Sequence, residues 1–387
     1  MLSISALGQE NSTSYWVEKG TEFYSNGSYD LAGRCFDKAI EQNPKSLDSW
    51  IYKGEILGLM GKLDEAINAS EKAIEIDPIN ASGWRIKGIA LAFQGKRDEA
   101  KYAIDNAIKI DPKSALLRDS RILILSNSNQ YIEAMQALDE ALELNQRDAG
   151  AWAIKGFYYI SVLKQYNESM QALDKATELD PNLSLAWFAK GYVLLNQGRY
   201  NESIQAYDNA IKAQDTVKQD WGEFFLVDSR YLYGFAWYQK GIVLDYQSKY
   251  DEAIKAYDEA IKAYDKLRYL GDSRFDEYLD DPYTDKAVAL EKLGRYNESL
   301  QAYNKVLELE RFEPRSVWYH KGVALEKLGR YNESIQAYDK VIEIYPHDAE
   351  AWAGKGLALN ALGRTTEASE AIDKAANFAH GRQELND

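Results

Sequence analysis

The sequence has few of the residues that build metal centres and disulfide frameworks, and it lacks a long apolar run. The one cysteine, Cys35, cannot form an internal disulfide and is expected to be a buried structural thiol, and the three histidines lie far apart. No apolar run approaches the roughly 20 residues that a transmembrane helix needs. Acidic residues outnumber basic ones, 61 to 46, and the net charge of −15 opposes binding to phosphate backbones or anionic lipids. We therefore expect no nucleic-acid partner and no membrane insertion.

Short motifs that identify common active sites are also missing. The chain has no GxxxxGK[ST], no GxGxxG after a strand, no HExxH, no G-x-S-x-G and no CxxC pair. Paired acids such as Asp280 and Asp281 exist, but in so acidic a chain we interpret them as solvated surface. The sequence thus predicts a protein that is not an enzyme and that needs neither a metal nor a cofactor.

The chain instead repeats one segment of twelve residues. GRYNESIQAYDK begins at Gly329, GRYNESLQAYNK at Gly294 and GRYNESIQAYDN at Gly198. Looser copies are KQYNESMQALDK from Lys164 and SKYDEAIKAYDE from Ser248. An active site is needed once, whereas a building block is needed many times, so the copies indicate a repeat architecture.

Tryptophan marks the period of this repeat. Trp16, Trp50 and Trp84 are spaced 34 residues apart, and most blocks read W-x-x-K-G-x-x-L from the tryptophan. The early copies close with a proline. The later members of the tryptophan series are Arg118, Trp152, Trp187, Trp237, Tyr283, Trp318 and Trp352.

The pattern resembles the tetratricopeptide repeat (TPR), a helix-turn-helix of 34 residues that reads W-x2-L-G-x2-Y, then A-x3-F, then P. Ten registers fit, from about residue 13 to 380. Lysine replaces the family's leucine before the glycine in almost every block, and the fourth block has Arg118 for Trp and Ile122 for Gly. The resemblance implies an all-α fold, a right-handed TPR α-solenoid in which each helix pair covers the next.

The repeat phase divides the chain. We assign residues 1–12 to a leader, 13–214 to repeats 1–6, 215–233 to an insert, 234–265 to repeat 7, 266–279 to a second insert, 280–380 to repeats 8–10 and 381–387 to a tail. The leader MLSISALGQENS is either the approach to the first helix or the remnant of a secretory signal. Localisation is cytoplasmic in the first case and exported or at the cell surface in the second.

Several repeated positions carry a structural expectation. Glycines inside helix A predict close crossings by a neighbouring helix, and glycines at its end predict left-handed turns. Asn201 or Asp251 is predicted to cap helix B, so we interpret the YNES sequons as caps rather than as glycosylation acceptors. Caps of the next helix A are expected at Ser46, Asn80, Ser114 and Asp348. The crossing glycines include Gly54, Gly88, Gly156, Gly191 and Gly241, and the turn glycines include Gly61, Gly95, Gly198 and Gly329.

The resemblance also implies where a partner would bind. In TPR arrays the concave face is lined by helix A, at the positions two before and one, five, eight and nine after the tryptophan. Aromatic residues there are candidate anchors for a bound segment, with mutual packing between blocks as the alternative. Mapped onto this chain, the concave candidates are Arg85, Phe93, Phe157, Phe188, Tyr192, Asn196, Phe235, Tyr238, Tyr246 and Tyr319.

Two inserts break the rhythm after repeats six and seven. Helix B of repeat seven is expected to continue, because residues 253–267 keep their apolar spacing without proline or glycine. Trp221, Phe224, Phe225 and Leu226 form an apolar cluster that the repeats do not need, so it either covers the extended helices or meets a partner.

The sequence therefore predicts a non-catalytic scaffold that binds a protein or peptide segment in the concave helix A groove. One alternative is a self-assembling array, a dimer or an end-to-end stack, that uses the inserts or the terminal repeats. A regulatory fragment of a larger enzyme is the other alternative. The identity of the partner is beyond the sequence.

Overall fold

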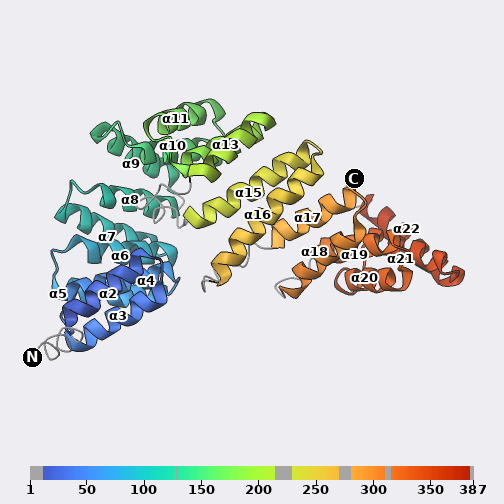
Figure 1. Ribbon diagram of the computed structural model, residues 1–387, viewed down its shortest axis with the longest axis horizontal. Helices are drawn as coiled ribbons and strands as arrows, with labels where there is room; N and C mark the ends of the chain where they lie inside the picture. The colour runs from blue at the N-terminus through green and yellow to red at the C-terminus, as the bar shows by residue number, and fades with distance from the viewer. Residues whose placement is uncertain (1–11, 128–129, 214–228, 270–279, 310–314, 384–387) are drawn as a thin grey trace, which may run out of the picture. The chain divides into compact units, whose positions relative to one another are not determined.

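The computed structural model describes residues 12–127, 130–213, 229–269, 280–309 and 315–383, and this part of the chain is all-helical (Figure 1). Helices A and B alternate along it, as in an α-solenoid of helix-turn-helix repeats. The all-α fold expected from the sequence is confirmed. The chain divides into unit 1, residues 1–189 with 217–228, and unit 2, residues 190–216 with 229–387, and each unit is described by itself.

In unit 1 each helix A is followed by its helix B. The helices A are α2 (Thr13–Ser25), α4 (Leu47–Leu59), α6 (Ala81–Phe93), α8 (Ala115–Asn127) and α10 (Ala149–Ser161). The helices B are α3 (Tyr29–Gln42), α5 (Leu63–Ile76), α7 (Arg97–Ile110), α9 (Tyr131–Leu144) and α11 (Tyr166–Leu179).

Unit 2 continues the same alternation, and α12 (Ser184–Asn196) runs across the boundary between the units. The further helices A are α15 (Ser229–Tyr246), α17 (Asp280–Lys292), α19 (Arg315–Lys327) and α21 (Ala349–Ala361). The helices B are α13 (Tyr200–Ala213), α16 (Tyr250–Tyr269), α18 (Tyr296–Glu308), α20 (Tyr331–Ile344) and α22 (Thr365–Gln383). The predicted extension of helix B in repeat seven is confirmed, because α16 has 20 residues against 14 in α13.

The first half of GRYNES builds the turn between helices A and B. Gly198 has a φ of 71°, and the other predicted turn glycines share this left-handed conformation. Lys164 and Ser248 hold it where repeats five and seven lack the glycine, with φ of 57° and 59°. Arg199 then donates to both carboxylate oxygens of Glu202, at 2.8 and 2.6 Å, which lowers the pKa of that exposed glutamate. The recurring Gly and Arg therefore serve the turn, not a site.

The predicted caps of helix B are wrong. Helix α13 begins at Tyr200, so Asn201 lies inside the first turn with an exposed side chain, and Asp251 lies in the same way in α16. The reason is the left-handed turn residue, which reverses the chain so tightly that Arg199 N already donates back to Leu194 O at 2.9 Å. The helix starts directly afterwards and needs no side-chain cap.

The predicted caps of helix A fare better. Asn80 Oδ1 accepts from Ser82 N at 3.0 Å, and Asp348 Oδ1 accepts from Ala351 N at 2.9 Å. Ser46 occupies the N-cap of α4, but no backbone N–H bonds to its hydroxyl there. Short polar side chains thus mark the start of helix A at α4, α6 and α21.

The second half of GRYNES locks helix B under helix A. Ser203 Oγ donates to the Gly191 carbonyl at 2.8 Å, and Ser334 bonds to Gly322 in the same way. A Cβ at Gly191 would lie 2.7 Å from Cε1 of Tyr207, a ring that is fully buried. The close crossing predicted at Gly191 is confirmed, and glycine is present because the tyrosine ring occupies the space of a side chain.

The lysine of W-x-x-K joins consecutive repeats. Lys155 Nζ donates to Asp139 on the preceding helix B at 2.5 Å and lies 5.4 Å from the Trp152 ring centroid. The indole N–H of Trp152 donates to Gln146 O at 3.0 Å. Equivalent ion pairs are Lys53 with Asp37, Lys87 with Glu71, Lys240 with Asp208, Lys286 with Asp258, and Lys355 with Asp339.

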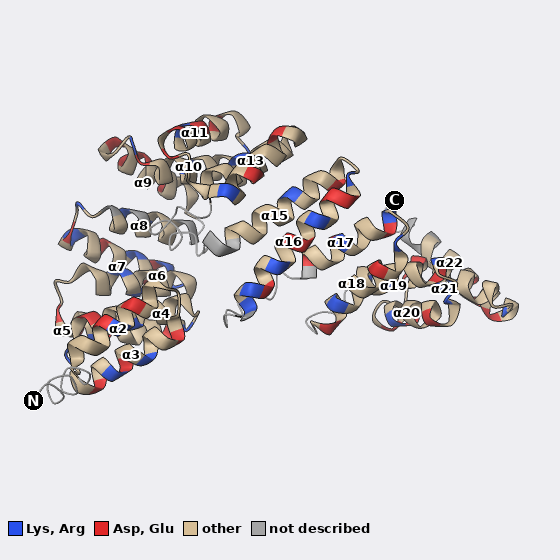
Figure 2. Cartoon of the chain, in the orientation of Figure 1, with Lys and Arg blue, Asp and Glu red and all other residues tan. Residues whose placement is uncertain are grey.

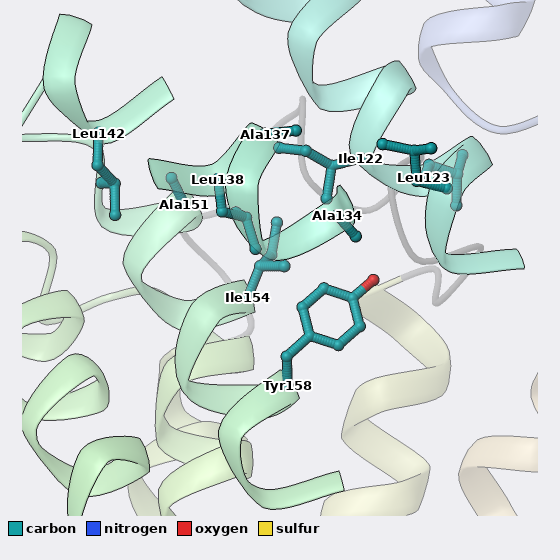
Figure 3. Packing of buried hydrophobic residues seen from close by; sticks show 10 residues of the cluster. Ile122, Leu123, Ala134, Ala137, Leu138, Leu142, Ala151, Ile154 and Tyr158 are labelled. Carbon is teal, nitrogen blue, oxygen red and sulfur yellow. The ribbon is translucent and has the colours of Figure 1, made fainter. Parts of the chain in front are cut away.

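The degenerate fourth block still forms a complete helix pair. Ile122 replaces the crossing glycine and is fully buried, and its facing residue on α9 is Leu138 rather than an aromatic ring (Figure 3). Ala134 and Ile154 lie in the same cluster, and Tyr158 of α10 borders it (Figure 3). Leucine at this helix B position is thus found opposite a glycine in the fifth repeat, Gly156 with Leu173, and opposite Ile122 in the fourth.

Candidate functional site

A hollow opens on the helix A face of unit 1, between α4 and α6. Its walls are mostly apolar and its lining includes two charged residues, Arg85 and Glu55. The side chains around it come from three successive helices A and one helix B. They are Tyr24, Glu55, Gly58, Leu59, Leu63, Arg85, Ile89 and Phe93.

Gly58 keeps this hollow open. A Cβ at Gly58 would have no atom within 4 Å outside its own helix, whereas one at Gly54, a turn earlier, would lie 3.2 Å from Ile86 Cγ2. Packing therefore disfavours a side chain at position 54 but not at position 58. A larger side chain at position 58 would enter the hollow.

Arg85 lies buried beside the hollow. Only 6% of the residue is exposed, and its Nη2 donates to Glu55 from the preceding helix A. Its Nε has no hydrogen-bond partner within the described part of the chain. Because breaking a buried ion pair leaves an uncompensated charge, Arg85 and Glu55 hold α6 against α4.

The helix A face of unit 2 has a different chemistry, made of tyrosines and acids. Tyr238 of α15 donates its hydroxyl proton to Asp285 of α17 at 2.8 Å. Lys292 of α17 bonds to Asp245 of α15 at 2.9 Å. These contacts bring α15 and α17 together on one face.

Burial and neighbouring acids perturb this face. Burial raises the pKa of Asp285, and the carboxylates of Asp281 and Asp245 add to the rise, while the hydroxyl of Tyr238 opposes it. The pKa of Tyr238 is raised by burial and then by Asp285. Helix α16 of the same unit differs from this acidic face, because acidic and basic residues are interspersed along it (Figure 2).

The structure places the predicted concave residues in different surroundings. Arg85 and Phe93 line the same hollow, and Phe235 lies 6.3 Å from Tyr238 between ring centroids. Phe188 is only 5% exposed, so it is a packing residue in the unbound chain. The remaining candidates are partly or fully accessible, and they are Phe157, Tyr192, Asn196, Tyr246 and Tyr319.

Accessible candidates are not all free of neighbours. Tyr246, 63% exposed, stacks on Tyr200 with the ring centroids 6.0 Å apart. Asn196 Nδ2 donates to the carbonyl of Tyr192 at 2.7 Å. The apolar cluster predicted in the first insert lies outside the described residues, and it comprises Trp221, Phe224, Phe225 and Leu226.

Sequence reasoning missed the residues that complete both faces. From the sequence, Glu55 was not connected with Arg85. Glu55 lies five residues after Trp50, and Arg85 lies one residue after Trp84, so both are at concave positions of successive repeats and their opposite charges could have been noticed. Asp285 lies two residues after Tyr283, a position that the concave pattern does not include. The sequence contains no pattern that singles out Gly58, because the open space beside it depends on residues that are brought near it only by folding.

No helix in the described ranges is long and apolar enough to cross a membrane. Among the same residues, no group of three or more His, Cys, Asp or Glu could hold a metal ion.

The alternation of short helix pairs, the turn glycines and the crossing glycines define a helical repeat protein. Tetratricopeptide repeat models match residues 13–46, 149–183, 281–312 and 349–379, and further models of that description match 35–68, 172–205, 234–267 and 316–348. These matches span more than half of the chain. The protein therefore belongs to the tetratricopeptide repeat family.

Solved TPR structures resemble this chain. "YrrB: a TPR protein with an unusual peptide-binding site" is 24% identical, with 47% of this chain and 93% of that one covered and a TM-score of 0.33. TTC0263, a thermophilic TPR protein of Thermus thermophilus, is 20% identical, with coverage of 48% and 100% and a TM-score of 0.43. The P58(IPK) TPR domain is 18% identical, with coverage of 91% and 99% and a TM-score of 0.31. No curated protein matches the sequence.

Proposed function

We propose that this protein is a non-catalytic scaffold that binds a segment of a partner protein along its helix A face. The hollow over Gly58 is the observation that carries the proposal. Leu59, Ile89 and Phe93 give it apolar walls, and a buried ion pair fixes its lining. Such a hollow suits one apolar side chain of a bound segment, as anchors in protein interfaces fill pockets of this kind.

The glycine itself supports this role. In a helix interior glycine is about 1 kcal/mol less favourable than alanine, and Gly58, the second-last residue of α4, should carry part of that cost. Because a methyl group at Gly58 would touch nothing, alanine would fit there without strain. The space is therefore not a requirement of folding, and we assign it to binding.

A peptide-display experiment tests the proposal. Random peptides would be selected against the wild-type protein, and their affinities measured for Gly58→Leu, Gly58→Ala and Gly33→Ala. Leucine should fill the hollow and weaken binding by at least tenfold, about 1.4 kcal/mol. Gly33→Ala on α3 is the matched control, since a methyl there would meet only Ile56 at 4.0 Å.

The expected order of affinity is wild type and Gly33→Ala first, then Gly58→Ala, then Gly58→Leu. Equal binding of the selected peptides by all four folded proteins would refute the hollow as the site. The affinity of the selected peptides would also be measured for substitutions at the other accessible candidates. These are Phe157, Tyr192, Asn196, Phe235, Tyr246 and Tyr319.

A further inference from the structure

The helix A face of unit 2 contains acids that lack basic partners. We define the tyrosine–acid face as Tyr238 and Asp245 of α15, Asp285 and Glu291 of α17, and Tyr319 and Glu326 of α19. Asp285 accepts from Tyr238 at 2.8 Å and Glu326 accepts from Tyr338 at 3.3 Å. Within the described residues, no lysine or arginine forms an ion pair with Asp285, Glu291 or Glu326.

Basic residues near this face are already engaged or distant from these acids. Lys292 pairs with Asp245, and Arg315 pairs with Asp348 and Glu350. His320 Nδ1 lies 3.3 Å from Glu291 Oε2. Lys327 is exposed at the end of α19. Among the described residues, Asp285 and Glu326 thus form no ion pair, and Lys292, whose charge lowers the pKa of Asp285, is shared with Asp245.

A second observation concerns Tyr303, whose neighbours include Glu291 and Asp285. Tyr303 of α18 is fully buried, and burial together with the carboxylates of Glu291 and Asp285 raises its pKa. The Glu291 Oε1 atom is likewise buried without a partner in the described part of the chain. The carboxylates of this face therefore lie beside buried phenol groups, with few basic residues near them.

The acids of this face differ from other acids of unit 2 in their partners. Elsewhere in unit 2 acids of helix B pair with arginines of the same turn, as Glu333 does with Arg330 and Glu367 with Arg364. On the tyrosine–acid face, Asp285 and Glu326 instead accept from the hydroxyls of Tyr238 and Tyr338, while Asp245 pairs with Lys292 and the Arg315 guanidinium lies 5.6 Å from the Tyr319 ring centroid. Aromatic rings beside carboxylates attract ammonium and guanidinium groups through both ion pairing and cation–π contact.

We propose that the tyrosine–acid face binds a partner segment rich in lysine or arginine. This inference rests on the proposed function, because it assigns a class of partner to the helix A face of unit 2. Charge complementarity selects the occupant: an acidic or purely apolar segment would leave Asp285 and Glu326 uncompensated, whereas a cationic segment neutralises them.

Binding of a defined probe tests this assignment. The probe is a fluorescent peptide of alternating lysine and alanine, measured by anisotropy at physiological salt, where the Debye length is about 8 Å. The test variant is Asp285→Asn with Glu326→Gln. The control, Glu370→Gln with Asp373→Asn, removes the same charge from exposed positions of α22.

We expect the test variant to weaken binding of the lysine-alanine peptide about tenfold and the control by less than about twofold. Equal weakening by both variants would show general attraction to an acidic protein and would overturn the inference, as would no effect of either. Both variants must keep the wild-type circular dichroism spectrum, and Glu326→Gln alone gives a milder second test. If these results fail while Gly58→Leu still abolishes binding of display-selected peptides, the inference falls and the proposed function stands.

Discussion

Replacing Gly191 by alanine should destabilise unit 2, although alanine is the better helix former. The new Cβ would lie 2.7, 2.8 and 2.9 Å from Cε1, Cδ1 and Cζ of Tyr207. These atoms belong to a rigid ring with no exposed surface, so the ring cannot move aside. Overpacking of this kind costs about 1 to 3 kcal/mol, and we expect about 3 because the neighbour is rigid. Helix propensity returns about 1 kcal/mol, which leaves a loss of about 2 kcal/mol.

Urea unfolding followed by circular dichroism measures this loss. Gly58→Ala is the matched control, since it makes the same chemical change at a position without neighbours and should gain up to about 1 kcal/mol. In a Tyr207→Ala background, Gly191→Ala should lose most of its cost, because the ring that it meets is gone. A Gly191→Ala protein as stable as Gly58→Ala would refute the reasoning that the ring occupies the glycine's space.

Two further changes test the electrostatics of unit 2. Asp285→Asn should raise stability at neutral pH. The folded pKa of Asp285 is raised above the ordinary value of 3.8, so ionisation of this carboxyl removes stability from the wild type as the pH rises through the folded pKa. In melting curves at several pH values, the stability gain of Asp285→Asn should therefore vanish below pH 3.8. A gain that is unchanged at low pH would contradict this. Asp348→Ala should lower stability by about 2 kcal/mol in urea titrations, because it removes the cap on Ala351 N and one partner of Arg315, whereas Asp348→Asn should keep most of the cap.

The fold was predictable because its signals are local and repeated. Turn glycines such as Gly198, crossing glycines such as Gly191 and the uninterrupted apolar spacing along α16 each act within one helix pair. The position of the helix B start was not predictable in the same way. The prediction placed a cap at Asn201, following the preference of asparagine for N-caps, but the backbone turn at Gly198 had already fixed the start at Tyr200.

The candidate site was less predictable, because it depends on contacts between repeats. Phe188 and Tyr192 are both assigned to the concave face by spacing, yet the first is buried and the second is partly accessible. The hollow at Gly58 and the pairing of Tyr238 with Asp285 require side chains from different helices A. Periodicity gives the face of a helix, whereas the packing of neighbouring repeats decides which residues on that face are open.

The ion pair between the W-x-x-K lysine and the preceding helix B has a consequence for how such a gene can grow. Most repeats present a lysine toward one neighbour and an acid toward the other, as Lys355 and Asp339 do across one junction. A block duplicated in phase therefore meets complementary charge at most junctions, which favours folding of the lengthened chain. At Asn304 this complementarity is missing: Lys321 lies over the Trp318 ring, 4.8 Å from its centroid, as Lys155 lies over that of Trp152, but it forms no ion pair with an acid among the described residues. The near-identical GRYNES copies are what a recent history of such duplications would leave.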